Sequence, residues 1–187
     1  MKIESVMTRR VVAARADTEL AHVARLMWDN DCGSVPVVDA EDKVVGILTD
    51  RDLCMGANFS GRALRELRAA SCMASEVVTC RPGDSVASVA KLMGTKKVRR
   101  VPVTDAAGRL LGLVSVGDIL NAATRSAAKE REQLQAALVE ALSAICAREP
   151  REEVAALVPA PRRAPAAAKA VKAAKPVKPA GKKRARV

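Results

Sequence analysis

The sequence predicts an α+β protein built from two copies of one β-α-β-β-α unit, followed by a further helix and a disordered basic tail. The first observation behind this prediction is a set of residues that return, unchanged in type, 66 positions later. They are Met7 and Met73, Met27 and Met93, Pro36 and Pro102, Gly46 and Gly112, and Asp52 and Asp118. Because this spacing is the same for all of these pairs, it indicates a duplicated unit. A unit of about 50 residues buries little surface alone, so the copies should pack together with a cleft between them.

The second observation is that the excess positive charge lies at the C-terminus. The chain has 32 Lys and Arg against 21 Asp and Glu, and residues 159–187 hold ten of the basic residues and no acidic one. The remainder is therefore nearly neutral, with 22 basic and 21 acidic side chains. Because residues 159–187 also lack large apolar side chains, and their like charges repel, we expect this tail to be disordered in isolation.

The first copy has the apolar spacing of alternating strands and helices. Leu20, Val23, Ala24 and Met27 fall on one face of a helix that Asp17 or Thr18 can cap. A polar turn at residues 39–42 separates two apolar runs, and the proline in the first run favours an edge or a strand start. The predicted elements are a strand at 11–13, the capped helix, strands at 34–38 and 44–48, and a helix from 49 to 55.

The second copy repeats this pattern, with Val86, Val89, Ala90 and Met93 as the apolar face of its first helix. Its predicted elements are a strand at 77–78, a helix at 85–93, strands at 101–103 and 110–114, and a helix at 115–120. Residues 58–61 break the chain between the copies, and a short helix fits residues 62–70. We divide the chain into a first repeat (1–58), a linker (59–70), a second repeat (71–124), a C-terminal helix (125–148) and a basic tail (149–187).

A further helix is predicted after the second copy, over residues 126–147. Its apolar stripe consists of Leu134, Leu138, Ala141, Leu142 and Ile145. This stripe is too short to indicate a coiled coil. It fits equally well a helix packed on its own module and a helix that contacts a second chain.

The composition argues against several classes of protein. No apolar run is long enough to cross a membrane, and the N-terminal residues lack the apolar stretch of a signal peptide. The five cysteines form no C-x-x-C pair, so free thiols in a reducing cytoplasm are expected. His22 is the only histidine, which makes a zinc site or a histidine-dependent nucleophile improbable. Since no Gly-rich phosphate loop is visible either, we expect no metal site, no catalytic residues and no enzymatic activity.

Each copy ends on the same kind of nine-residue block. The blocks read Val45-Gly46-Ile47-Leu48-Thr49-Asp50-Arg51-Asp52-Leu53 and Leu111-Gly112-Leu113-Val114-Ser115-Val116-Gly117-Asp118-Ile119. In these blocks, and in the Val-Pro-Val runs at 35–37 and 101–103, the chain resembles the cystathionine-β-synthase (CBS) domain family over roughly residues 3–122. The resemblance implies a tandem pair that forms one compact module. It also implies two pockets between the repeats, for ligands such as AMP, ADP, ATP or S-adenosylmethionine.

The end of each block places a hydroxyl and a carboxylate where a strand passes into a helix. These are Thr49 with Asp52, and Ser115 with Asp118. A helix N-terminus attracts phosphate, the hydroxyl can bind a phosphate oxygen, and the carboxylate can accept from the vicinal hydroxyls of a ribose. The alternative is a capping box, in which both side chains bind the backbone of their own helix. Together with the duplication and the family resemblance, the pattern favours a nucleotide site.

Four further residues are candidate ligand contacts. Arg51 and Arg100 can reach a ligand phosphate, and since a glycine and a serine stand at the equivalent positions of the other copies, the two pockets cannot be equivalent. No aromatic residue is placed to stack on a base. We therefore expect adenine to lie between aliphatic walls such as Val35 and Val101.

The tail has the composition of a flexible polycation. Such segments bind the phosphate backbone of nucleic acids by releasing counterions, without reading the base sequence. The predicted nucleic-acid contacts are Lys169, Lys172, Lys175, Lys178, Lys182, Lys183, Arg184 and Arg186. The alternative is a tail without a dedicated role, which only aids solubility or adheres to RNA.

These observations lead to two hypotheses for function. The first is a non-catalytic regulatory module that senses adenine nucleotides and has an accessory nucleic-acid-binding tail. The alternative is a nucleoid-associated DNA-binding protein in which the repeat pair is mainly a dimerisation scaffold. In both, we expect a homodimer. The family resemblance implies one, and it would cover the apolar helix faces (Ala21, Ala24 and Met27; Ala87, Ala90 and Met93) that one module does not bury alone.

Overall fold

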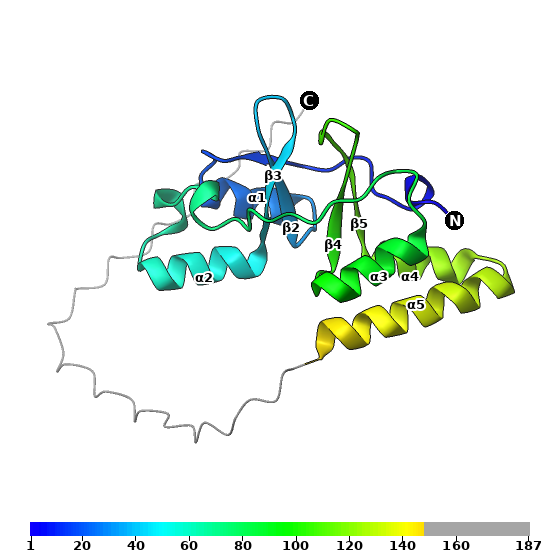
Figure 1. Ribbon diagram of the computed structural model, residues 1–187. Coiled ribbons are helices and arrows are strands. Elements are labelled where there is room, and N and C mark those ends of the chain that lie inside the picture. The colour runs from blue at the N-terminus through cyan, green and yellow to red at the C-terminus, as the bar shows by residue number, and fades with distance from the viewer. Residues whose placement is uncertain (148–187) are drawn as a thin grey trace, which may run out of the picture. The chain divides into compact units, whose positions relative to one another are not determined.

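The computed structural model describes residues 1–147, and the predicted basic tail lies outside them. The first repeat contains a three-stranded sheet and two helices (Figure 1). Strand β2 pairs with β1 in parallel and with β3 in antiparallel orientation. The elements are β1 (Ala14–Arg15), α1 (Leu20–Asp29), β2 (Ser34–Val38), β3 (Val44–Thr49) and α2 (Asp50–Ser60).

The second repeat has the same order of elements but only two assigned strands, which form an antiparallel hairpin. Its elements are α3 (Val86–Lys96), β4 (Arg100–Thr104), β5 (Leu110–Ser115) and α4 (Val116–Arg125). The pairing register is duplicated as well, because Val37 faces Gly46 in the first hairpin and Val103 faces Gly112 in the second. Both hairpins therefore expose and bury equivalent positions.

The predicted elements are confirmed in type, with shifted ends and two exceptions. Strand β1 lies three residues later than predicted, and residues 77–78 form no strand; nearby, Cys80 makes a single parallel bridge to Val103. Helix α2 continues through Phe59 to Ser60 and ends where Gly61 adopts a φ of +63°, which glycine accepts without strain. The predicted short helix at 62–70 is instead two 3₁₀ turns, Leu64–Glu66 and Ala69–Ser71.

The apolar residues gather in two cores, one for each repeat. In the first core, Leu20, Val23 and Met27 of α1 pack against β2 and β3, as the helical spacing predicts. In the second core, Val86, Val89, Ala90 and Met93 of α3 take the equivalent places, packed against β4 and β5. Each core is thus a small sheet covered by helices.

The N-terminal segment of each repeat packs on the other repeat. Ile3 and Met7 belong to the core of the second repeat, whereas Leu67 and Ala69 belong to the core of the first. Backbone hydrogen bonds fix this exchange on both sides: Thr8 N–H donates to Leu113 O at 2.9 Å, and Ala74 N–H donates to Ile47 O at 3.0 Å. The two repeats are therefore interlocked and not merely adjacent.

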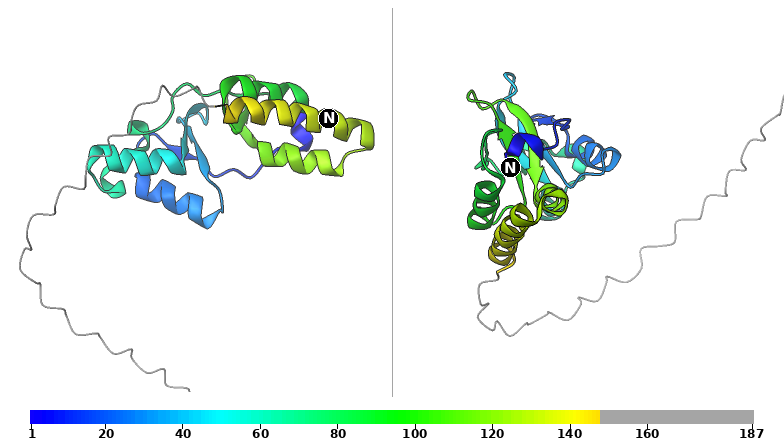
Figure 2. Two further views of the ribbon diagram at one scale, coloured as in Figure 1. Left: turned by 90° about the horizontal axis from the view of Figure 1, so that it is seen from below. Right: turned by 90° about the vertical axis from the view of Figure 1, so that its right-hand side faces the viewer.

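A last helix, α5 (Ala128–Cys146), packs on α3 and α4 of the second repeat (Figure 2). Leu134, Leu138 and Ala141 are its buried residues. The structure thus decides between the two interpretations of this helix, because its apolar stripe covers its own module. It also corrects one half of the expected dimer surface, since Ala90 and Met93 are buried beneath α5 and are not free to meet a second chain.

Candidate functional site

The hydroxyl and carboxylate that end the second repeat lie at the start of α4. Ser115 is the N-cap residue, and its Oγ accepts a hydrogen bond from Asp118 N–H at 3.1 Å. Asp118 Oδ2 in turn accepts from Ser115 N–H at 2.8 Å and from Ser115 Oγ at 2.7 Å. The two side chains are therefore held rigidly at the positive end of the α4 dipole.

Thr49 and Asp52 form the same arrangement at the start of α2. Asp52 Oδ2 accepts from Thr49 N–H at 2.8 Å and from Thr49 Oγ1 at 2.7 Å. The capping box that the spacing predicts as an alternative is thus present in both repeats. It leaves one carboxylate oxygen free, because within residues 1–147 hydrogen bonds reach only Oδ2 of Asp52 and of Asp118.

A hollow of about 360 Å³ opens beside the Ser115–Asp118 box, and residues of both repeats line it. Leu113, Ser115 and Asp118 come from β5 and α4, and Arg100 comes from β4. The other lining residues come from the segment that precedes β1, from the segment between α1 and β2, and from the first residue of β2. From these segments the hollow is lined by Thr8, Arg10, Val11, Val12, Asn30, Asp31, Cys32, Gly33 and Ser34. Its size is that of a pocket for a small organic ligand.

Two arginines give this hollow its positive charge. Arg10 and Arg100 both line it, and within residues 1–147 neither guanidinium forms an ion pair or donates a hydrogen bond. A guanidinium is always charged and binds phosphate in a bidentate manner. Two such groups, both unengaged, make the hollow suited to an anionic ligand.

Ser34 lines the same hollow, and its buried hydroxyl has no partner among the described residues. Ser34 is 2% exposed, and within the described part of the chain its Oγ forms no hydrogen bond. A buried hydroxyl left unpaired costs about 1–3 kcal/mol, so such groups are normally satisfied by protein, water or ligand. The unpaired Ser34 hydroxyl is therefore a polar group beside the hollow whose hydrogen bond is still to be made.

Several of the predicted site residues lie elsewhere. Val35 and Val101 are fully buried in the two cores, so they are not the aliphatic walls of the hollow; Val11, Val12 and Leu113 have that place. The side chain of Arg51 is exposed on α2 and does not line the hollow, although Arg100 does. Of the Thr49–Asp52 pair, Asp52 lines a separate hollow with Met55 and Phe59.

Arg10 and Ser34 line the hollow, although no motif in the sequence predicts them as site residues. Neither belongs to the nine-residue blocks, and both reach the Ser115–Asp118 box only because the repeats interlock. The two capping boxes also differ in the residues at equivalent positions around them. Where the Ser115–Asp118 box has Arg10 and Arg100, the Thr49–Asp52 box has Glu76 and Ser34. At the Thr49–Asp52 box, a carboxylate and a hydroxyl therefore stand in place of the two arginines.

Other chemical groups of the described residues offer little reactivity. No group of three or more His, Cys, Asp or Glu side chains that suits a metal ion occurs in residues 1–147, and His22 is exposed. Burial, with a smaller contribution from the charge of Asp84, raises the pKa of the Cys80 thiol to about 12, so this thiol stays protonated at neutral pH. No helix in the same part of the chain is long and apolar enough to cross a membrane.

Comparison with known proteins places this geometry in a family. The family model described as "CBS domain" matches residues 3–56 and 65–125. An uncharacterized protein of Methanopyrus kandleri is 36% identical over 115 residues, which are 61% of this chain but only 59% of that relative. Two solved structures share the fold. The CBS domain pair of protein MJ0100, in complex with 5-methylthioadenosine and S-adenosyl-L-methionine, has a TM-score of 0.59 and 23% identity, and the match covers 65% of this chain and 94% of that one.

The second structure, CBSX2 in complex with AMP, has a TM-score of 0.58 and 24% identity, over 66% of this chain and 96% of that one. The residues matched by the CBS domain model contain both interlocked repeats, the two capping boxes and every residue that lines the hollow. The chain therefore belongs to the CBS domain family and carries two CBS domains in tandem.

Proposed function

We propose that this protein is a regulatory module that binds an adenine nucleotide and has no catalytic step of its own. The observation that carries the proposal is the hollow beside Asp118, which combines two unengaged arginines, a free carboxylate oxygen and an unpaired buried hydroxyl. Each of these groups lacks a partner within the described residues, and a nucleotide can supply one for each. The adenosine ligands named for MJ0100 and CBSX2 support the same ligand class.

Each part of a nucleotide has a matching group in the hollow. Asp118 Oδ1 can accept from the ribose hydroxyls, and the N-terminus of α4 with Ser115 attracts a phosphate. Arg10 and Arg100 can bind the phosphates through their guanidinium groups. Val11, Val12 and Leu113 offer the apolar surface against which adenine lies.

Charge separates the candidate ligands AMP, ADP, ATP and S-adenosylmethionine. The sulfonium group of S-adenosylmethionine is positive, and two unpaired guanidinium groups repel it, whereas phosphates are attracted. We therefore expect ADP and ATP to bind more tightly than AMP, and S-adenosylmethionine to bind weakest. The Thr49–Asp52 box, with Glu76 where the other has Arg10, is proposed as a second and weaker site.

The test is equilibrium dialysis of the full chain with radiolabelled ADP, comparing Arg10→Glu with Arg51→Glu. Both variants make the same charge change on an exposed arginine, but only Arg10 lines the hollow. Losing a charge-assisted contact costs about 1.5–3 kcal/mol, so Arg10→Glu should weaken ADP binding roughly 10- to 100-fold, and Arg51→Glu less than about twofold. Equal effects of both substitutions, or no ADP retained by the unaltered protein, contradict the proposal.

We further propose that the module acts as a homodimer in the cytoplasm, with the basic tail as an accessory nucleic-acid-binding segment. The cysteines Cys32, Cys54, Cys72, Cys80 and Cys146 are unpaired, which fits a reducing compartment. The lysines and arginines expected to contact nucleic acid lie outside the described residues, so this part is supported by composition alone. If Arg10→Glu has no effect on ligand binding while tail deletion abolishes nucleic-acid binding, the alternative of a DNA-binding protein with a scaffold module is favoured.

A further inference from the structure

A run of basic residues extends from the end of α3 to the start of β4 in the second repeat. Residues 96–100 read Lys-Lys-Val-Arg-Arg, and we call them the basic run. Lys96, Lys97 and Arg99 are exposed, and Arg100 lines the ligand hollow. Within residues 1–147, none of these four side chains forms an ion pair. The basic run is therefore a positive surface whose charge the described part of the chain does not neutralise.

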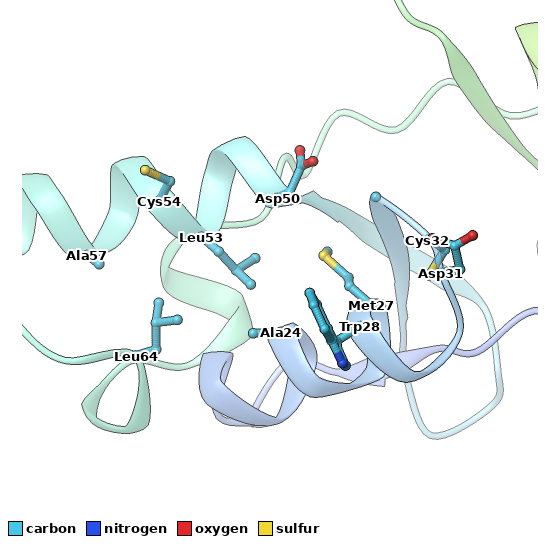
Figure 3. Close-up of a pocket in the computed structure, with 11 residues that line it drawn as sticks. Ala24, Met27, Trp28, Asp31, Cys32, Asp50, Leu53, Cys54, Ala57 and Leu64 are labelled. Carbon is cyan, nitrogen blue, oxygen red and sulfur yellow. The ribbon is translucent and has the colours of Figure 1, made fainter.

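The duplication shows that this charge is not required by the fold. At the equivalent positions of the first repeat, residues 30–34 read Asn-Asp-Cys-Gly-Ser and include no basic residue. Figure 3 shows this segment after α1, where Asp31 and Cys32 lie at one end of a pocket between α1 and α2. The two segments share their backbone turn, because Asp31 has a φ of +46° and Lys97 has a φ of +53°. The same turn thus accepts an acidic residue in one repeat and a basic residue in the other.

Local structure accounts for only one of the exposed charges. Lys96 lies in the last turn of α3, where the helix dipole favours a positive side chain. Lys97 follows in the left-handed region, which asparagine and aspartate accept more readily than lysine. Arg99 accepts a hydrogen bond from Val116 N–H at 3.0 Å through its carbonyl oxygen, and this contact does not depend on the side chain. The charges at positions 97 and 99 therefore need a reason outside the local fold.

The basic run also holds most of the basic residues of the second repeat. Residues 71–124 contain seven Lys and Arg and four Asp and Glu, a net charge of +3, whereas residues 1–58 contain seven and ten, a net charge of −3. Four of the seven basic residues lie in the basic run. Of the acidic ones, Asp105 is paired with Arg109 at 2.7 Å, and Asp118 is held in its capping box. A polyanion is therefore attracted to the second repeat and repelled by the first.

The chain leaves the folded module next to the basic run. Helices α3 and α5 lie side by side and end close together (Figures 1 and 2). The contact is tight near these ends, since a Cβ on Gly94 would lie 2.9 Å from the α-carbon of Ala141. Lys96 follows Gly94 by two residues, and the last described residue, 147, follows Ala141 by six. The charged part of the tail begins 12 residues later, at 159, and such a segment spans at most about 40 Å, so a nucleic acid held by the tail can reach the basic run.

The chemistry of the basic run favours nucleic acid over a membrane surface. Val98, the one apolar residue of the run, packs against the core of the second repeat, so the run offers no large apolar side chain to a lipid layer. Phosphate contacts need only positive side chains, and they hold a protein on the phosphate backbone without base contacts. We propose that the basic run is a contact surface for the phosphate backbone of nucleic acid, and that it acts together with the tail.

The basic run extends the contact that the tail makes. Three or four phosphate contacts on their own give weak binding, which salt easily disrupts. Linked to the tail, they become an intramolecular second contact, at a local concentration on the order of millimolar. The folded module without the tail is thus expected to lose DNA, whereas the complete chain binds through both parts. Lys96 and Lys97 then steepen the dependence of the logarithm of the binding constant on the logarithm of the salt concentration by about 1.8, at about 0.9 for each contact.

Arg100 connects this surface with the ligand hollow. A phosphate group that binds Arg100 removes its guanidinium from the basic run and places negative charge beside Arg99. Neighbouring residues lie well within the Debye length of about 10 Å at 0.1 M salt, so this charge repels the phosphates of nucleic acid. ADP in the hollow should therefore weaken nucleic-acid binding, and nucleic acid should weaken ADP binding by the same factor. This second part rests on the proposed function, whereas the contact surface does not.

The contact surface is tested with the complete chain by fluorescence anisotropy of a labelled DNA duplex of about 20 base pairs, in a salt series that begins at about 50 mM. Lys96→Asn combined with Lys97→Asp gives the basic run the residues that the same turn has in the first repeat, so the fold is kept. Binding of this variant at about 50 mM salt should be at least about tenfold weaker, and its salt dependence should be shallower by about 1.8.

The matched control is Lys43→Asn combined with Lys129→Asp. Both lysines are exposed and form no ion pair within residues 1–147, so the same change of charge is made elsewhere. The control should bind DNA within about threefold of the unaltered chain, with an unchanged salt dependence. Equal effects of the two double variants, or no DNA binding by the unaltered chain, overturn the proposal. If the Lys96–Lys97 variant loses binding to phosphatidylserine vesicles but not to DNA, the surface binds membranes and the proposal is also overturned.

The linkage is tested by repeating the DNA titration at saturating ADP. ADP should weaken DNA binding at least about fivefold, and inorganic pyrophosphate at the same concentration, which lacks the adenosine part, should weaken it by less than about twofold. Equal effects of the two anions show simple competition and contradict the linkage. If ADP is retained in dialysis but leaves DNA binding unchanged, the linkage is wrong. If ADP is not retained, the proposed function fails, and the comparison of the two double variants still decides the contact surface.

Discussion

The carbonyl oxygen of Thr8 lies so close to Gly112 that a Cβ on residue 112 would be only 2.7 Å from it. Gly46, the equivalent residue of the first repeat, is in turn covered by the side chain of Met73. In each case the covering segment belongs to the other repeat, next to the backbone bonds that interlock the pair. The recurring glycine of the nine-residue block is thus explained by close approach of a second chain segment and not by its own φ, which lies outside the left-handed region.

This relationship predicts that Gly112→Ala destabilises the protein more than Gly46→Ala. The neighbour of residue 112 is a backbone oxygen, which cannot move without shifting the whole segment, whereas the neighbour of residue 46 is a methionine side chain that can change rotamer. We expect Gly112→Ala to lower the free energy of unfolding by about 1–3 kcal/mol. Urea denaturation measures this free energy of unfolding. Gly83→Ala is the control and should leave it nearly unchanged, because a Cβ on Gly83 meets nothing within 4 Å.

The interlocking itself could not be predicted from the sequence. The periodicity of Leu20, Val23 and Met27 and the apolar run of β3 are local signals, and the structure confirms the elements that they predict. The packing of Ile3 on the second repeat is a contact between residues distant in the chain, and no local pattern records it. The prediction of a strand at residues 77–78 is wrong for a related reason, because β-prone residues form a strand only where a partner strand is available along their length.

The second prediction concerns α5, which closes the second repeat. Leu138 is 3% exposed in the core, and its neighbour Val139, about 100° further around the helix, is 68% exposed. Leu138→Ala should lower the free energy of unfolding by about 2–5 kcal/mol, because it removes buried methyl groups and leaves a cavity. Val139→Ala should change it by less than about 0.5 kcal/mol. Thermal unfolding of both variants is the measurement, and similar melting temperatures would show that α5 is not part of the folded core.

The third prediction separates capping from ligand binding at the two boxes. Asp52→Ala and Asp118→Ala each remove one capping carboxylate with nearly identical hydrogen bonds. Both should therefore cost a similar amount of stability, about 0.5–2 kcal/mol. Binding of ADP should suffer more from Asp118→Ala, because only Asp118 lines the hollow that contains Arg10 and Arg100. If a folded variant that carries both Asp52→Ala and Asp118→Ala binds ADP with unchanged affinity, capping is the sole role of the two carboxylates.

The site could be predicted from the sequence only in part. The Ser115–Asp118 pair and Arg100 stand in or next to recurring motifs, and the structure brings these three residues to one hollow. Arg10 and Ser34 carry no motif, and Val35 and Val101 have the composition of a pocket wall but the alternation of a buried strand. Which apolar residue of a strand faces a ligand depends on tertiary packing, which the sequence pattern does not specify.

The fourth prediction follows from the raised pKa of Cys80. The unfolded thiol titrates near 9.0 and the folded one near 12, so the folded state holds the proton more tightly. The resulting stability is complete below pH 9 and is lost as the pH rises from 9 towards 12, by up to about 1.4 kcal/mol for each pH unit. Denaturation curves at pH 8 and pH 10.5 should show a smaller loss in Cys80→Ala than in the unaltered chain. Cys54→Ala, at an exposed cysteine, is the control and should behave like the unaltered chain.

The last prediction concerns the basic tail, whose ten positive charges lie within residues 159–187. We expect it to bind nucleic acid without sequence preference, because contacts between positive side chains and phosphates carry no information on the base sequence. If ~6 of the charges contact phosphates, the logarithm of the binding constant should fall against the logarithm of the salt concentration with a slope near −5, at about 0.9 for each contact.

Fluorescence anisotropy with two unrelated DNA duplexes across a salt series measures this slope. A chain that ends at residue 158 is the matched control, and it should lose DNA binding while its affinity for ADP stays the same, because the ligand hollow lies entirely within residues 8–118. A strong preference for one duplex would contradict the non-specific mode, since counterion release depends on phosphate spacing and not on base sequence. Absence of binding at low salt would remove the tail from the function of this protein and leave the CBS pair as its only working part.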